Sequence, residues 1–178
     1  MYTLRMRFRI LPGNGGGSAA PSATNNDNVT PLQTCVNQQD SACCALLLDA
    51  GAETEVKDPA GQRPLHVAAE QRDADCLNLL LGKEAETTPK TDNGDTALHL
   101  ATRNSDAACV RPLLVSGSIV DERDAENNCP LHLAAQCDSP ECVAIIIEFG
   151  PDTETMNGAG ETPLHISVRR PTLSTSPP

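Results

Sequence analysis

A recurrence with a period of about 33 residues is the feature that most constrains this chain. Its only four histidines are evenly spaced at this period, and each ends a phrase of the same form. The phrases are Arg63-Pro64-Leu65-His66, Thr96-Ala97-Leu98-His99, Cys129-Pro130-Leu131-His132 and Thr162-Pro163-Leu164-His165. One period earlier, Thr30-Pro31-Leu32-Gln33 keeps the form but lacks the histidine. In-phase copies of this kind predict a repeat array in which each unit packs on the next.

The residues around each phrase predict a tight turn followed by a short helix. Residues that tolerate a left-handed backbone stand two positions before the Thr position. They are Asn28, Gly61, Gly94, Asn127 and Gly160. Thr is a good N-cap, and Pro at the next position suits the first helical turn. Arg63 and Cys129 replace that Thr, which costs roughly 1 kcal/mol of capping each.

A second helix is predicted after each phrase. Its N-caps also recur in phase, at Asp40, Asp73, Asp106 and Ser139. Apolar runs follow at 46–48, 79–81, 113–115 and 145–147, and Gly51, Gly117 and Gly150 supply the C-terminal stops. Glu84 occupies the stop position of one repeat, where Gly82 is predicted to end the helix two residues early. Pro112 falls inside another second helix, so that helix starts late or the third repeat is a weak point.

The phrase and its period resemble the ankyrin repeat family, whose T-P-L-H-x-A signature recurs about every 33 residues. The resemblance covers residues 25–170. It implies an all-α solenoid of helix-turn-helix layers joined by β-hairpin loops. Residues 25–57, 58–90, 91–123 and 124–156 form four full repeats, and 157–170 form a partial fifth. Residues 1–24, basic and then Gly/Ser-rich, and residues 171–178, Pro-rich, are predicted to be disordered.

The charge distribution limits the classes of partner. Residues 25–170 hold ten basic and all 24 acidic residues, which is a net charge of −14. A surface this acidic repels phosphate backbones, so nucleic acid is not expected as a partner. No apolar run approaches the ~20 residues that span a bilayer. A secretory signal is not expected, and the alternation of apolar residues with Arg5, Arg7 and Arg9 suits a strand better than a mitochondrial presequence.

The repeated histidines and cysteines are interpreted as structural. Equivalent residues of neighbouring layers lie ~8–10 Å apart, too far for shared zinc ligands or disulfides. Each histidine is predicted to form hydrogen bonds across its own turn and to the neighbouring hairpin. Cysteines recur at Cys43, Cys76, Cys109 and Cys142, and reduced thiols indicate a cytoplasmic or nuclear location. No cofactor is expected, and no histidine is left for a nucleophilic site, so the segment is predicted not to be an enzyme.

Function is therefore assigned to positions that vary between repeats. In the ankyrin family partners meet the hairpin tips and the exposed end of the first helix, along a concave groove. The resemblance transfers this role to Gln62, Glu70, Gln71, Asp92, Asn93, Asp95, Arg103, Asn104, Glu126, Asn128 and Gln136. The expected partner is a protein with a basic or mixed-charge surface, and no oligomer is expected.

Two functions remain open. One is a stand-alone, non-catalytic protein-binding module. The other is the regulatory ankyrin segment of a larger enzyme or channel, for example one like a calcium-independent phospholipase. The incomplete fifth repeat favours the second, and the Pro-rich terminus favours the first.

Overall fold

The computed structural model describes residues 22, 24–26 and 29–169. The predicted C-terminal tail, most of the predicted N-terminal segment and the predicted turn at Asn28 lie outside these residues.

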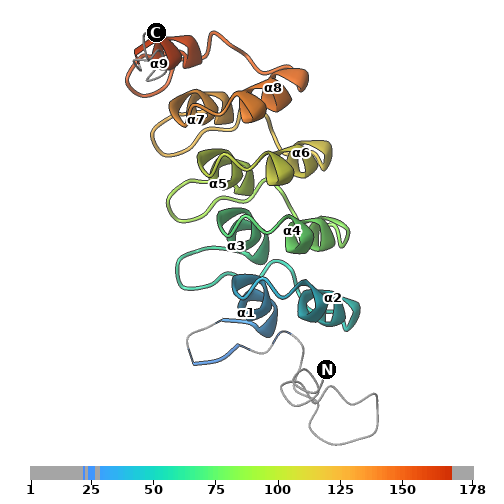
Figure 1. Cartoon of the computed structure of the whole chain (residues 1–178). Coiled ribbons are helices and arrows are strands. Elements are labelled where there is room, and N and C mark those ends of the chain that lie inside the picture. Colours follow the sequence, from blue (N-terminus) through green and yellow to red (C-terminus); the bar gives the residue numbers. More distant parts are fainter. Residues whose placement is uncertain (1–21, 23, 27–28, 170–178) are drawn as a thin grey trace, which may run out of the picture.

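The described residues form helices stacked in two columns (Figure 1). The first helix of each layer lies in one column, which comprises α1 (Pro31–Asn37), α3 (Pro64–Glu70), α5 (Ala97–Arg103), α7 (Pro130–Gln136) and α9 (Pro163–Arg169). The second helices form the other column, which comprises α2 (Ser41–Asp49), α4 (Ala74–Leu81), α6 (Ala107–Val115) and α8 (Pro140–Glu148). The loops between layers project beyond the first-helix column (Figure 1). We number the layers one to four from α1/α2 to α7/α8. The all-α solenoid expected from the sequence is confirmed.

The predicted N-caps stand where the helices begin. The hydroxyls of Thr30 and Thr96 accept from the amides of Gln33 and His99, three residues on. Asp40, Asp73 and Ser139 cap α2, α4 and α8 in the same way. Asp106 occupies the cap position of α6, but its side chain makes no capping hydrogen bond. The regular spacing of the caps along the sequence therefore sets the spacing of the helices.

The loop before each first helix closes in one repeated pattern. Asp58, Thr91, Asp124 and Asn157 each donate their amide to the carbonyl four residues on and accept from the amide three residues on. The latter amide belongs to Gly61, Gly94, Asn127 or Gly160, and all four have positive φ. The turns predicted at these four residues are thus confirmed. The hairpins are tight loops, and none of the described residues lies in a regular strand.

The ends of the second helices correct one prediction in part. Gly51, Gly117 and Gly150 have left-handed φ, as predicted. In the second layer, however, Gly82 keeps right-handed helical angles, and Glu84 itself takes a φ of 59°. Gly82 is thus the C-cap at which α4 ends, as predicted, but the left-handed turn that a glycine supplies in the other layers falls on Glu84. The rest of the stack requires the same turn in every layer, and it imposes this turn on Glu84 despite its Cβ.

Pro112 does not delay the start of α6. This helix begins at Ala107, one residue after its cap, as α2, α4 and α8 do. The late start that the sequence left open is therefore wrong. Pro112 stands inside the helix, where it has no N–H to donate to the carbonyl of Ala108.

Three of the four histidines link successive layers, as predicted, whereas the side chain of His165 among the described residues bonds only to Thr162 of its own turn. Nδ1 of His99 accepts from the amide of Thr96 at 3.2 Å, and Nε2 lies 3.0 Å from the Glu122 carbonyl in the next loop. His66 and His132 are buried in the same arrangement, with Nε2 3.0 Å from the carbonyls of Pro89 and Glu161. Each of these imidazoles therefore connects two layers by hydrogen bonds, a connection that we call a latch.

In the first layer an amide replaces the imidazole. Oε1 of Gln33 accepts from the Thr30 amide at 2.9 Å. Its Nε2 donates to the carbonyls of Val56 and Gln62 in the next loop, at 3.0 and 3.2 Å. The first repeat has therefore lost the histidine of the phrase but kept its latch.

The core is built from small and aliphatic side chains between the two columns. All eight cysteines are thiols, and all but Cys137 are buried. Burial raises the pKa of Cys44 to about 11, so its thiol stays protonated at neutral pH. These cysteines act as small apolar core residues. No described helix is long and apolar enough to cross a membrane.

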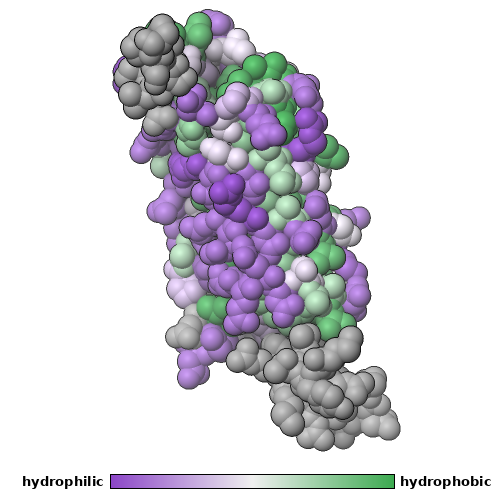
Figure 2. Space-filling view, in the orientation of Figure 1, coloured by the Kyte–Doolittle hydropathy of each residue, from purple (hydrophilic) through white to green (hydrophobic). Residues whose placement is uncertain are grey.

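The outer side of α9 is open. Leu164 is 71% exposed, whereas its counterpart Leu131, one layer earlier, is 4% exposed. Val168 of α9 and Ile147 of α8 are likewise exposed. Elsewhere hydrophilic side chains gather over the loops and first helices, and apolar ones over the second helices (Figure 2).

Candidate partner-binding face

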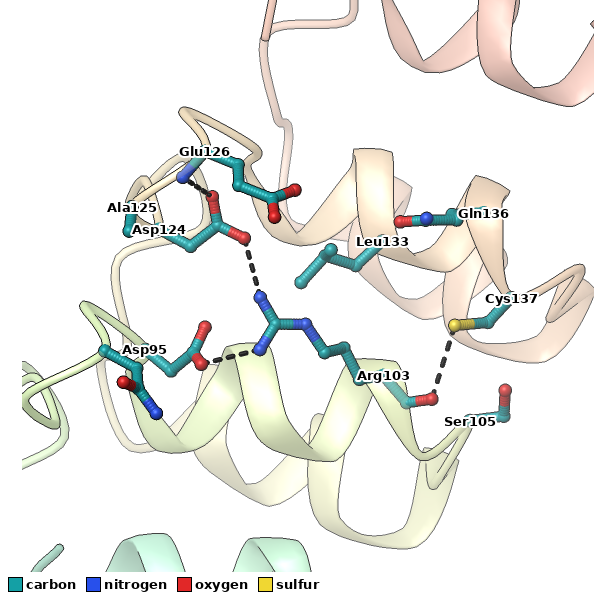
Figure 3. Close-up of a pocket in the computed structure, with 10 residues that line it drawn as sticks. Asp95, Arg103, Ser105, Asp124, Ala125, Glu126, Leu133, Gln136 and Cys137 are labelled. Carbon is teal, nitrogen blue, oxygen red and sulfur yellow. Dashed lines mark hydrogen bonds and ion pairs between the residues drawn. The ribbon is translucent and has the colours of Figure 1, made fainter. Parts of the chain in front are cut away.

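Arg103 is the centre of a charged cluster on the loop face. It is the last residue of α5, and its guanidinium lies between two carboxylates (Figure 3). Nη1 donates to Asp95 at 2.6 Å and Nη2 donates to Asp124 at 2.8 Å. Asp95 belongs to its own loop and Asp124 to the next one. The pKa of Arg103 is raised because the hydrogen bonds and charges of the two aspartates outweigh its partial burial.

Asp124 is rigidly placed because it closes its own loop. Its Oδ1 accepts from the amides of Glu126 and Asn128 at 2.9 and 2.8 Å. Its side chain is only 1% exposed. Burial alone would raise its pKa, but the hydrogen bonds from Asn128 and Glu126 lower it below the ordinary value. The carboxylate is therefore ionised and available to Arg103 at neutral pH.

A hollow of about 780 Å³ opens beside Arg103, between the third and fourth layers. Five predicted contact residues line it, and they come from both layers. They are Asn93, Asp95, Arg103, Glu126 and Gln136. Its other lining residues are Ser105, Asp124, Ala125, Leu133 and Cys137 (Figure 3). The hollow is thus the place where the structure brings the predicted residues together.

The two kinds of predicted position pair with each other across the face. At three of these sites the residue before the Thr position contacts the last residue of the first helix, eight positions on. These pairs are Gln62 with Glu70 at 2.8 Å, Asp95 with Arg103 at 2.6 Å, and Glu161 with Arg169 at 2.7 Å. In the fourth layer Asn128 bonds instead to Asp124 and Asn157, and Gln136 has no hydrogen-bond partner among the described residues.

The remaining predicted residues differ in how accessible they are. Gln71, Asp92, Asn93 and Glu126 are exposed. Asp95 and Asn128 were predicted to contact a partner together with the loop tips. They are buried, because they lie beneath those tips. Asn104 stabilises the contact between two layers, since its side-chain amide donates to the carbonyls of Ala69 and Glu70 in the layer before.

The loop tips stack directly on one another. A Cβ on Gly61 would collide with the carboxylate of Asp92 in the next loop. A Cβ on Gly158 would come within 2.7 Å of the Glu126 carbonyl, which accepts from the Gly158 amide at 2.9 Å. The tips therefore form one continuous ridge beside the first helices.

Sequence reasoning missed Asp124 and the lining residues Ser105 and Leu133. Asp124 had a readable signal, because Asp58, Thr91, Asp124 and Asn157 recur in phase with the repeat and can all accept a loop amide. The partners of Arg103 could not be read in this way, since no other layer has the same two residues as Asp95 and Arg103 at these positions. The Sγ of Cys137, another lining residue, lies 3.3 Å from the Arg103 carbonyl.

Within the described ranges, His, Cys, Asp and Glu side chains nowhere gather in threes that could hold a metal ion. The face offers carboxylates, amides and guanidinium groups, which suits polar recognition.

Comparison with known proteins follows this geometry. No curated protein matches the chain. The family profile for ankyrin repeats, which describes three copies at a time, matches residues 8–91, 35–124, 65–157 and 98–174 in overlapping frames. Together these matches cover nearly the whole sequence, and their spacing agrees with the stacked layers of the structure. The chain belongs to the ankyrin repeat family.

Proposed function

We propose that this chain is a non-catalytic module that binds a partner protein along the ridge of loop tips and the first helices. Ankyrin repeats are generally protein–protein interaction modules and are typically non-catalytic. The observation that carries the proposal is the hollow between the third and fourth layers, where five variable residues meet. In a protein whose framework residues repeat, the part that varies is the part available for selective contacts.

The partner is a protein with a basic or mixed-charge surface. Residues 25–170 carry a net charge of −14, and the exposed side chains of Asp92 and Glu126 add carboxylates to the ridge. Complementary charge accelerates association and selects against acidic competitors. The same charge disfavours nucleic acid. Our proposal is a module that acts as a single chain in the cytoplasm or nucleus.

A purified partner, captured from the native cell by affinity purification and mass spectrometry, tests this proposal. Its affinity would be measured by calorimetry at two salt concentrations for the wild type and the double variant Asp92→Asn/Glu126→Gln. We expect the variant to bind about tenfold more weakly and to depend less on salt. The matched control is Asp75→Asn/Glu141→Gln, because these two exposed acids lie on the second-helix side. Equal losses in both variants would remove the assignment to this face.

The open side of α9 favours the second candidate, a regulatory segment of a larger enzyme or channel. Leu164 and Val168 are exposed, whereas the equivalent positions in earlier layers are covered. A further layer or a neighbouring domain packed there would bury them. Under this alternative the ridge would contact a segment of the same protein. Sequencing of the full-length transcript distinguishes the two candidates, because a downstream catalytic or channel domain is present in only one.

A further inference from the structure

The hollow beside Arg103 contains more acidic than basic groups. Its lining includes three carboxylates, from Asp95, Asp124 and Glu126, and one guanidinium. Its formal charge at neutral pH is therefore −2. Arg103 already donates to two of the carboxylates. The third, Glu126, is exposed and accepts only a 3.3 Å hydrogen bond from Asn128 among the bonds that the structure describes.

Asp124 does not need another partner. One of its oxygens accepts two loop amides, and the other accepts from Arg103 and from the side chain of Asn128. These bonds satisfy a buried carboxylate.

Asp95 is different. Its side chain is 7% exposed, and Oδ2 accepts from Arg103. Its Oδ1 is buried and has no hydrogen-bond partner among the described residues. A buried carboxylate oxygen without a donor destabilises the folded chain. A donor group that reached this oxygen would therefore bind favourably. Asp95 lines the hollow, so a donor group that enters the hollow lies next to this carboxylate.

The fourth layer provides the opposite wall. Gln136 is exposed there and has none of the partners that Glu70, Arg103 and Arg169 find at the same position. Leu133 lies between Gln136 and the carboxylates, and Ala125 lies beside Asp124 at the other end of the hollow (Figure 3). Carboxylates, a free amide and a short apolar wall together match a side chain with an aliphatic stem and a cationic end.

We propose that this hollow is a subsite for one cationic side chain, Arg or Lys, of the partner protein, with its charged end between Asp95 and Glu126. The hollow of about 780 Å³ has room for the side chain and the backbone beside it. The cation donates to Oδ1 of Asp95 and to the Glu126 carboxylate, and its stem lies against Leu133. The subsite refines the proposed function, because it names the residue type that the ridge selects.

NMR titration tests the subsite without the unidentified partner. The probes are Nα-acetyl-arginine amide, Nα-acetyl-lysine amide and the uncharged isostere Nα-acetyl-citrulline amide, added to the ¹⁵N-labelled full chain. We expect saturable shifts of the amides of Asp95, Arg103 and Gln136 with a cationic probe, at dissociation constants on the order of millimolar. Citrulline should cause no saturable shift at these residues. Comparison of the two cationic probes shows whether a planar guanidinium or a compact ammonium fits better.

Two variants separate binding from folding. Asp95→Asn should weaken cation binding about fivefold or more, because it removes the charge of the orphan carboxylate. Glu126→Gln should do the same from an exposed position that leaves the fold intact. Asp92→Asn is the matched control, since Asp92 is an acid at a loop tip outside the hollow. Unchanged affinity in both Asp95→Asn and Glu126→Gln, or equal shifts with citrulline, overturns the subsite.

The outcome is independent of the partner-binding experiment. If the probes bind as expected but a purified partner ignores the ridge variant, the hollow binds a cationic side chain, but the partner does not use this face and the proposed function fails. If the ridge variants weaken the partner but the cationic probes do not bind, the proposed function stands and the subsite is wrong.

Discussion

Arg103 and Asp124 join two layers through a single ion pair whose acidic partner is almost completely buried. The two residues are 21 positions apart, and Nη2 lies 2.8 Å from Oδ2. Since Asp124 also closes its own loop, the guanidinium of one layer is fixed to the turn geometry of the next.

Asp124 therefore has two separable roles. Asp124→Ala removes both the loop contacts and the ion pair, and should lower the free energy of unfolding by about 2–3 kcal/mol. Asp124→Asn should cost only about 1 kcal/mol, because Asn157 shows that an amide oxygen accepts the same two loop amides. Urea denaturation followed by circular dichroism measures both. Equal losses would mean that the loop contacts contribute nothing separate.

The left-handed backbone at Glu84 predicts a stabilising substitution. Glu84→Gly removes the Cβ penalty at a φ of 59° and should raise the free energy of unfolding by about 0.5–1 kcal/mol. Gly117→Ala is the matched reverse change, because a Cβ there would meet no atom within 4 Å and so tests the backbone alone. That variant should be destabilised by about 1 kcal/mol. A stabilising Gly117→Ala would contradict the explanation.

The proline within α6 predicts a weak third layer. Pro112→Leu restores the missing amide donor and places the residue that Leu46 and Leu79 provide in earlier layers. We expect a gain of about 1–3 kcal/mol in the free energy of unfolding. Native-state hydrogen exchange should also show slower opening of α6 in the variant. If α6 exchanges as slowly as α4 in the wild type, the proline does not weaken this layer.

The buried histidines predict a loss of stability on mild acidification. Burial lowers the pKa of His66, His99 and His132 from the ordinary value of 6.5. The unfolded chain therefore binds more protons than the folded chain below about pH 6.5, and stability falls as the pH decreases through that range. For each histidine the loss grows as the pH falls below 6.5, until the lowered pKa of the folded state is reached.

The variant His99→Gln isolates this effect, because Gln33 already makes the equivalent contacts with an amide. The variant should keep the latch and show a shallower slope of stability against pH between 7 and 5.5, as measured by thermal unfolding. Asp124 and Glu122 have lowered pKa values, so their contribution is lost only below their ordinary range near pH 4. A slope identical to that of the wild type would assign the acid sensitivity to other groups.

The repeating part of the fold could be predicted from the sequence because each structural need recurs at a fixed position. The caps at Asp40 and Asp73 and the turns at Gly61 and Gly94 follow from local chemistry alone. The left-handed conformation of Glu84 could not be predicted, since the stack overrides the local preference of the residue. The burial of Asp95 was equally hidden, because it depends on how one loop covers the next. The same two positions also pair in Gln62 with Glu70 and in Glu161 with Arg169, but the residue types at these positions vary, so the ion pair between Asp95 and Arg103 does not follow from the repeat alone.

The latches also have a direction along the chain. Each buried imidazole binds a carbonyl that lies 23 or 29 residues farther toward the C-terminus. During translation a layer therefore leaves the ribosome before the group that locks it, and it is completed only when the next loop emerges. Synthesis would consequently add order one layer at a time from the N-terminal end. Ribosome-stalled chains exposed as far as residue 96 should resist proteolysis within α3, whereas those exposed only to residue 86 should be cleaved there.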